Sequence, residues 1–413
     1  ALGFSLAASM GGWFVASVAM IVRQFLQWVR AARPGERAEA TSALARAYLH
    51  SDLSTDDLAA AEGAMIMLLD DPSPLVRQAM AEVFASSQKA PPVVVRALAA
   101  DQFEVAQPLL ERSPLIGDDD LVDLVAAGRP STQLAIARRV LLSTAVAAAI
   151  AEVATPEACL ALLENGDADI TLASVDRIIG RFGHLAPIRE NLLARDDLPM
   201  TMRQALLSQL SRTLAGFVAE RQWLGPRHAE YATREACEKA TVALAADTPY
   251  EEIGDLVQHL RQSGQLTAGM ILRALLSGNV VLFEEALAEL SDMPLDRVGS
   301  HVHDRSLAGF RALYRKAELP ELAYPAFRAA LVALREGMLI GEARDAVRLK
   351  RRMVERVLDV CSEEGCESTL LALLRRFAVE AAREEARSFC DDLVAEPPMP
   401  GVLYQITDAR VAA

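Results

Sequence analysis

The sequence is poor in aromatic residues and in cysteine. Aromatic residues make up 5% of its 413 positions, and it contains only five cysteines. Because the cysteines are odd in number and unevenly spaced, they do not predict a disulfide framework, and we expect reduced, mostly buried thiols. Runs of β-branched residues that alternate with polar ones, the usual signal of strands, are nearly absent. The chain is instead rich in Ala and Leu, which favour helix, so the composition predicts an all-α protein.

Basic residues are also in the minority. There are 42 Lys and Arg against 56 Asp and Glu, and the formal net charge is −14. A general nucleic-acid-binding protein needs a basic face that displaces counterions from phosphates, so this charge argues against that class. It is typical of a soluble cytoplasmic protein. The sequence has no phosphate-binding loop, no GxSxG nucleophile motif and no Rossmann fingerprint, so we expect neither an enzyme nor a bound cofactor.

The first 22 residues contain no charged side chain. That length is just enough for a helix to span a bilayer. The arginines that follow, from Arg23 onward, would leave the bulk of the chain in the cytoplasm. However, Met20 also opens an ordinary amphipathic segment, so residues 1–19 fit a buried helix or a non-native leader equally well. The sequence leaves open whether the protein is cytoplasmic or tethered to the inner membrane.

Residues 67–83, MLLDDPSPLVRQAMAEV, predict the end of one helix, a turn and the start of another. Pro72 disfavours helix at the residue before it. Ser73 suits the N-cap of a new helix, and Pro74 suits its first turn. Apolar residues then return at spacings of three and four, which indicates one buried stripe. This segment is therefore predicted to form a short antiparallel helix pair.

The same pattern recurs along the chain at roughly 30 to 40 residues, the range typical of helical solenoids. Similar segments begin at Leu98, Leu124, Leu162 and Leu192, and residues 274–290 align on residues 67–83 without a gap. One such pair cannot cover its own apolar face, so neighbouring pairs must stack. We therefore predict an α-solenoid of stacked antiparallel helix pairs, arranged as one array or as two helical subdomains.

Four regions are expected along the chain. An apolar extension covers residues 1–19, helical repeats cover residues 20–220, a second helical region covers residues 221–394, and a tail covers residues 395–413. The boundary at residues 221–233 rests on a Gly-Pro turn that interrupts the first array.

The segment LLDDPSPLVRQAMAEVF resembles a HEAT-like repeat. In HEAT arrays the turn Asp and the helix Arg, here Asp71 and Arg77, form a ladder between repeats; the downstream copy has Glu284 in place of the Arg and does not predict a regular ladder. The stretch from Met20 to about Leu331 resembles a bacterial family of unknown function with HEAT-like repeats, found mainly in alphaproteobacteria. That resemblance also rests on VRQFLQWVRAARPGERAEATSALARAYL and LTAGMILRALLSGNVVLFEEALAEL. It implies a fold and no established activity.

Six basic residues fall close together on one predicted helix of this acidic chain. They are Arg344, Arg348, Lys350, Arg351, Arg352 and Arg356. Such a face suits a phosphate, an acidic partner or an anionic membrane surface, and we name it the candidate partner or anion surface. The same pattern is also typical of a solvated helix face whose cations pair with Glu342, Asp345 and Glu355.

Two further groups resemble metal or redox sites only superficially. His301 and His303 would share a face on a strand but not on a helix, where zinc ligands are usually three or four residues apart. Cys361 and Cys366 lack CxxC spacing and have no His nearby. We therefore expect a helix end at the histidines, buried thiols at the cysteines, and no metal site.

The scaffold predicts a function class rather than a reaction. We expect a non-enzymatic scaffold or regulatory protein that binds another protein, because stacked helix pairs form an extended surface. One alternative is a HEAT-like nucleic-acid-binding or repair enzyme, and another is a membrane-tethered adaptor that depends on residues 1–22. The partner, the pathway and the oligomeric state do not follow from the sequence.

Overall fold

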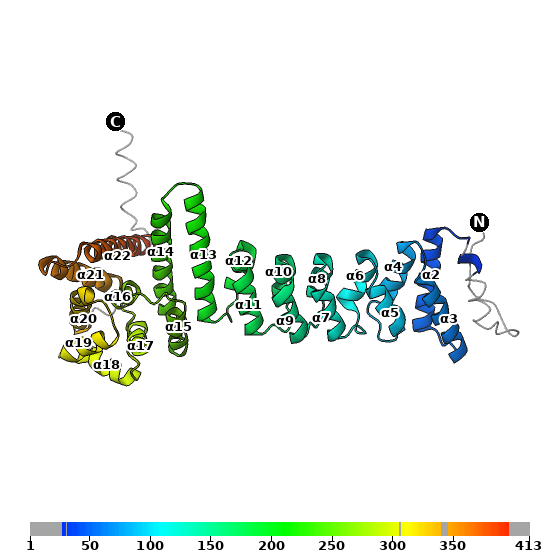
Figure 1. Cartoon of the computed structure of the whole chain (residues 1–413), viewed down its shortest axis with the longest axis horizontal. Coiled ribbons are helices and arrows are strands. Elements are labelled where there is room, and N and C mark those ends of the chain that lie inside the picture. Colours follow the sequence, from blue (N-terminus) through cyan, green and yellow to red (C-terminus); the bar gives the residue numbers. More distant parts are fainter. Residues whose placement is uncertain (1–26, 30, 305–306, 340–345, 396–413) are drawn as a thin grey trace, which may run out of the picture. The chain divides into compact units, whose positions relative to one another are not determined.

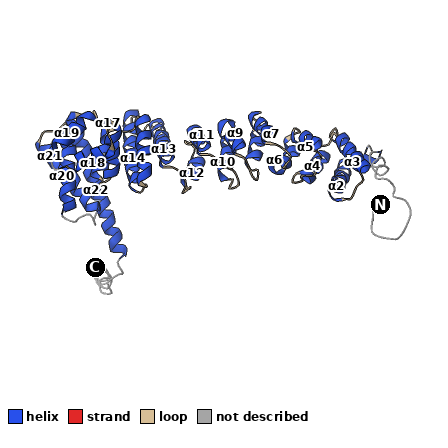
Figure 2. Cartoon of the chain, turned by 90° about the horizontal axis from the view of Figure 1, so that it is seen from below, coloured by secondary structure: helices blue, strands red, loops and turns tan. Residues whose placement is uncertain are grey.

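The computed structural model describes residues 27–29, 31–304, 307–339 and 346–395. Within these residues the protein is all-helical, as predicted, and an isolated bridge between Leu142 and Ala168 is its nearest approach to a sheet (Figure 2). No helix in this part of the chain is both long and apolar enough to cross a bilayer. The expected apolar extension at 1–19 lies outside the described residues, and so does the expected tail at 395–413 apart from Ala395, the last residue of the final helix.

Contacts between Cα atoms divide the chain into two compact units, Ala1–Asp196 and Asp197–Ala413. Residues 221–233, where we expected a boundary, lie in the second unit and cover the turn between α13 (Met200–Glu220) and α14 (Pro226–Ala246) together with the start of α14. These helices pack against each other, and that packing keeps them in one unit.

The first unit consists of helices that pack on their next-but-one neighbours. The even-numbered helices are α2 (Pro34–His50), α4 (Pro74–Phe84), α6 (Phe103–Arg112), α8 (Pro130–Ala137), α10 (Pro156–Glu164) and α12 (Ala186–Leu193). The odd-numbered helices are α3 (Thr55–Leu68), α5 (Pro92–Ala99), α7 (Asp118–Ala126), α9 (Thr144–Val153) and α11 (Leu172–Phe182). Each even-numbered helix packs on the next even-numbered one, and α7, α9 and α11 do the same, so the unit has two helical layers (Figure 1).

The α3–α4 pair forms where residues 67–83 predict it. α3 ends at Leu68, and α4 begins at Pro74 with Ser73 in the N-cap position. The Ser73 side chain makes no capping hydrogen bond; its backbone N–H instead donates to Asp71 Oδ1 at 2.8 Å. Val76, Met80 and Phe84 are buried at helical spacing, so α4 buries one stripe against its neighbours.

An arginine–aspartate ladder joins the first three even-numbered helices. Arg37 of α2 donates two hydrogen bonds of 2.8 Å to Asp71 in the α3–α4 turn. Arg77 of α4 donates to Asp101 in the α5–α6 turn at 2.5 and 3.0 Å and to the Asp71 carbonyl oxygen. The HEAT-like segment contains Asp71 and Arg77 but does not predict their partners, because each pair joins one helix to the turn before the next even-numbered helix.

The ladder makes the stability of the first unit dependent on acid. Burial alone would raise the pKa of Asp71, but hydrogen bonds from Arg37 and the Ser73 N–H outweigh it and hold that pKa below its usual range. A hydrogen bond from Arg77 likewise lowers the pKa of Asp101, against the opposing effect of burial. Carboxyl groups with lowered pKa in the folded state stabilise it fully above their unfolded pKa of about 4, and this contribution is lost as the pH falls through the folded pKa.

The double variant D71N/D101N is therefore expected to have a lower thermal unfolding midpoint than the wild type near neutral pH. The difference is expected to stay constant from about pH 7 to about pH 5 and to shrink as the pH falls from about 4 to about 3. Thermal unfolding of the full chain at several pH values measures it. The variant D70N, which changes the exposed neighbouring Asp70, is the control. A difference that stays constant over the pH range would contradict this role of the ladder.

A second set of hydrogen bonds joins the turns that follow the even-numbered helices. Arg139, after α8, donates to the carbonyl oxygens of Leu110, in the last turn of α6, and Ser113, which follows α6. Asn165, after α10, donates to the carbonyl oxygen of Arg139 at 2.8 Å. The Asp169 N–H then donates to the Leu142 carbonyl oxygen at 3.0 Å, which places the α8–α9 and α10–α11 turns side by side.

The second unit contains a long hairpin of α13 and α14, a set of shorter helices from α15 to η1, and three longer helices from α20 to α22. Its helices are α13 (Met200–Glu220), α14 (Pro226–Ala246), α15 (Tyr250–Gln262), α16 (Ala268–Leu276), α17 (Val280–Ser291), α18 (Leu295–His303), α19 (Leu307–Lys316), η1 (Glu321–Ala323), α20 (Tyr324–Leu339), α21 (Ala346–Glu363) and α22 (Ser368–Ala395). The turn between α16 and α17 falls at Gly278 and Asn279, as the alignment on residues 67–83 predicts. Gly278 takes a φ of 76°, and Asn279 caps α17.

Candidate functional site

A pocket of about 450 Å³ lies in the second unit, between α13, α14 and the turn that joins α15 to α16. Polar side chains line it from three segments, with Ser208 and Arg212 from α13, Glu238 from α14 and Gln265 from the turn, but more of the lining surface is apolar than polar. Cys237 of α14 also lines it. The extended surface expected of stacked helix pairs does not predict this pocket. Two helices and a turn line the pocket. Each can be predicted from nearby residues, but only the tertiary packing brings their side chains together.

Glu238 is an acidic residue of this pocket with a raised pKa. Thr267, at the N-cap of α16, accepts a hydrogen bond from the Met270 N–H at 3.1 Å and donates one to Glu238 Oε1 at 2.9 Å. Burial raises the pKa of Glu238 despite that hydrogen bond and the nearby positive charge of Arg273. The capping hydroxyl thus holds the carboxyl group in place beside the pocket.

Other residues in and beside the pocket form a chain of hydrogen bonds. Gln204 donates to Gln265 Oε1 at 2.7 Å, and Gln265 donates to Ser208 Oγ at 3.2 Å. Burial raises the pKa of the Cys237 thiol, which disfavours the thiolate that a nucleophilic cysteine requires. The arrangement is suited to hydrogen-bonding a polar group.

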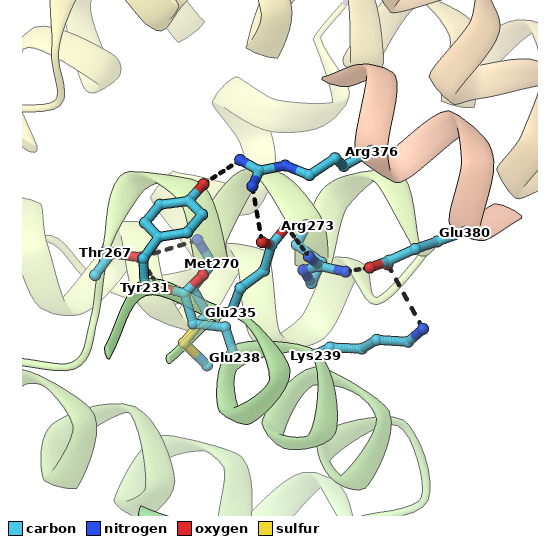
Figure 3. Close-up of polar contacts among 9 residues, drawn as sticks. All are labelled: Tyr231, Glu235, Glu238, Lys239, Thr267, Met270, Arg273, Arg376 and Glu380. Atoms are coloured by element: carbon cyan, nitrogen blue, oxygen red, sulfur yellow. Dashed lines mark hydrogen bonds and ion pairs between the residues drawn. The ribbon is translucent and has the colours of Figure 1, made fainter. Parts of the chain in front are cut away.

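Behind the pocket, a buried arginine joins α14, α16 and α22 (Figure 3). Arg273 has only 7% of its side chain exposed, and it forms ion pairs with Glu380 at 2.6 Å and Glu235 at 3.5 Å. Its guanidinium group also lies 4.0 Å from the ring centroid of Phe377. Two carboxylates and an aromatic face therefore compensate the burial of this charge.

Other cations extend the network toward the surface. Arg376 of α22 forms an ion pair with Glu235 at 3.2 Å and donates a hydrogen bond to the Tyr231 hydroxyl oxygen. Lys239 lies 3.6 Å from Glu380. The α14 residues of this network, Tyr231, Glu235 and Lys239, are four residues apart and so share one face of the helix. This polar stripe can be recognised in the sequence. Their partners on α16 and α22 are too distant in the sequence for that stripe to predict the network.

The candidate partner or anion surface is placed on α21, apart from Arg344, which lies outside the described residues. Lys350 forms an ion pair with Glu384 of α22 at 2.6 Å. Arg351 forms ion pairs with Glu385 of α22 at 2.6 Å and with Glu355 of its own helix at 2.8 Å. The predicted pairing with Glu355 is present, but the sequence analysis did not anticipate the pairs with α22.

Three more members of this predicted surface belong to the same helix. Arg348 lies 3.7 Å from Glu385. Arg352 and Arg356 are exposed. Much of the basic charge of α21 therefore faces acidic residues of α22, and the helix pair is held together partly by these charges.

The two histidines of the predicted helix end lie on α18, which ends at His303. His303 Nε2 lies 2.8 Å from Glu284 Oε1, and burial raises the pKa of Glu284 against the opposing effect of His303. Among the described residues, no three His, Cys, Asp or Glu side chains converge as metal ligands would. Cys361 is buried, and burial raises the pKa of its thiol to about 12, whereas Cys366 is half-buried.

Comparison with known protein families gives one match. The family described as "Uncharacterised protein conserved in bacteria (DUF2336)" matches residues 105–366, which is more than half of the chain. The chain belongs to this bacterial family. No curated protein and no solved structure matches it.

The DUF2336 match begins within α6 and ends in the turn before α22. We expected the family resemblance to run from Met20 to about Leu331, so the match starts later and extends further. It includes α13 to α16, and therefore the whole pocket together with Glu235, Glu238 and Arg273. The partners from α22, Glu380 and Arg376, lie beyond it.

Proposed function

We propose that this DUF2336 protein is a non-enzymatic, HEAT-like α-solenoid that acts as a scaffold and binds another protein along the first unit. The observation that carries the proposal is the packing of each even-numbered helix on the next, from α2 to α12. Arg37 and Arg77 bond the turns on one edge, while Arg139 and Asn165 bond those on the other. Repeated pairs joined in this way form a long, rigid surface.

A strained leucine supports a binding surface at the α8–α9 and α10–α11 turns. Leu141 has a φ of 57°, a conformation that costs an L-residue roughly 1–2 kcal/mol. Its side chain is 83% exposed, so burial does not offset that cost. Val140, beside it on the α8–α9 turn, and Leu172, the first residue of α11, are also exposed. A strained backbone that presents apolar side chains to solvent is a reasonable place for a partner to bind.

The variant L141G is expected to raise the free energy of unfolding by about 0.5–1 kcal/mol, because glycine adopts this φ without strain but loses more entropy on folding. Chemical denaturation of the full chain measures the change. A loss of stability would show that the Leu141 side chain packs within the protein.

Partner binding is tested by affinity capture with mass spectrometry from the native host. The double variant L141S/L172S is expected to lose a partner that the wild type retains. The control M67S/L75S changes two exposed apolar residues at the α3–α4 turn and is expected to retain it. Identical capture by both variants and the wild type would contradict this surface, and tight, salt-sensitive DNA binding would contradict the scaffold function.

A further inference from the structure

The closed end of the α13–α14 hairpin is built on a rigid turn. Gln222 takes a φ of 57°, and its N–H donates to the Ala219 carbonyl oxygen at 3.0 Å. The Trp223 N–H donates to the Val218 carbonyl oxygen at 3.2 Å. These two hydrogen bonds form a Schellman motif, which fixes the backbone of Trp223 relative to α13.

This turn presents apolar side chains to solvent rather than burying them. Trp223 is 63% exposed, and Leu214, Phe217 and Leu224 are exposed beside it. The rings of Phe217 and Trp223 meet edge to face with centroids 5.7 Å apart, and the Arg221 guanidinium group lies 4.4 Å from the Phe217 centroid. The aromatic groups therefore hold one another in place while still facing outward.

The same end of the hairpin is locally basic. Residues 221–228, which close the hairpin, contain two arginines and no aspartate or glutamate, although Glu220 and Glu230 flank them and the chain as a whole carries a net charge of −14. Arg221 and Arg227 are both exposed. Rigid aromatic and aliphatic groups thus lie beside positive charges. This combination suits a binding target that has an apolar interior beneath an anionic surface.

We infer that the hairpin end docks on the surface of an anionic lipid bilayer, with Trp223 and Leu224 entering the boundary between headgroups and acyl chains. In Figure 1 this end extends past α15, α16 and α22 of its own unit, so it is a protrusion rather than a groove. A stable protein partner typically covers about 800 Å² on each side, more than four partly exposed side chains supply. A fluid bilayer accepts a small convex tip, and tryptophan favours its interface.

Vesicle binding of the full chain tests the inference. The reporter variant W13F/W28F leaves Trp223 as the only tryptophan. Vesicles of equal parts phosphatidylglycerol and phosphatidylcholine are expected to sediment this protein and to shift Trp223 emission to shorter wavelength. Pure phosphatidylcholine vesicles are expected to do neither. Because the emission comes from the hairpin itself, vesicle binding through residues 1–22 would leave it unchanged and would overturn the inference.

Two pairs of variants separate the apolar and the charged contributions. In the otherwise wild-type chain, W223A/L224A is expected to weaken sedimentation with the anionic vesicles by about tenfold or more. F389A, which removes an exposed ring from α22, is expected to leave sedimentation unchanged. R221E/R227E is expected to abolish it, whereas R96E/R129E makes the same change in net charge on the first unit and is expected to retain it. Equal binding by the two members of either pair would overturn the inference.

Discussion

Replacing Arg273 with alanine is expected to lower the free energy of unfolding of the second unit by about 3 kcal/mol, near the lower end for breaking a buried ion pair. The Arg273 side chain is almost fully buried between Glu380 and Glu235, and it lies over the ring of Phe377. Its removal leaves Glu235 and Glu380 with only their more exposed partners, Arg376 and Lys239, and also removes the contact with the ring. The penalty therefore comes mostly from the groups left behind.

Lys239 offers a matched control for Arg273, because both cations contact the same carboxylate of Glu380. The Lys239 side chain is 51% exposed, and K239A is expected to cost no more than about 0.5 kcal/mol. Chemical denaturation followed by Trp223 emission in the W13F/W28F background reports on the second unit. Equal losses for R273A and K239A would show that burial does not distinguish the two cations.

The variant F283A is expected to destabilise the second unit by about 3–5 kcal/mol, the range for removing a fully buried aromatic side chain. Phe283 of α17 is completely buried. Its ring centroid lies 6.4 Å from that of Phe310 and 6.2 Å from that of Phe327, so three helices share this cluster. The same denaturation experiment measures the loss.

Two variants show whether the loss from F283A arises from an unfilled cavity. F283L keeps most of the volume and is expected to cost less than F283A. F389A removes an exposed ring and is expected to change the free energy of unfolding by no more than about 0.5 kcal/mol. A small loss for F283A, comparable to that for F389A, would mean that the surrounding helices close the cavity.

Local sequence patterns determined the positions of several helices and turns. Pro72, Ser73 and Pro74 predict where α4 begins, and Gly278 with Asn279 predicts the turn before α17. These predictions succeed because helix capping and proline geometry depend on residues within a few positions of one another. Ala and Leu content was likewise sufficient to predict an all-helical protein, since helix propensity is a property of single residues.

Tertiary structure alone decided which charges meet and where a pocket forms. Arg273 and Glu380 are 107 residues apart, and Lys350 pairs with an acid on α22 that no periodic pattern connects to it. The ladder from Arg37 to Asp71 depends in the same way on how two helices are rotated about their axes. A helical pattern predicts which residues share a face. Which face of a neighbouring helix that face contacts depends on the rotation and register of the two packed helices. Rotation and register are in turn set by the packing of all the side chains between the helices.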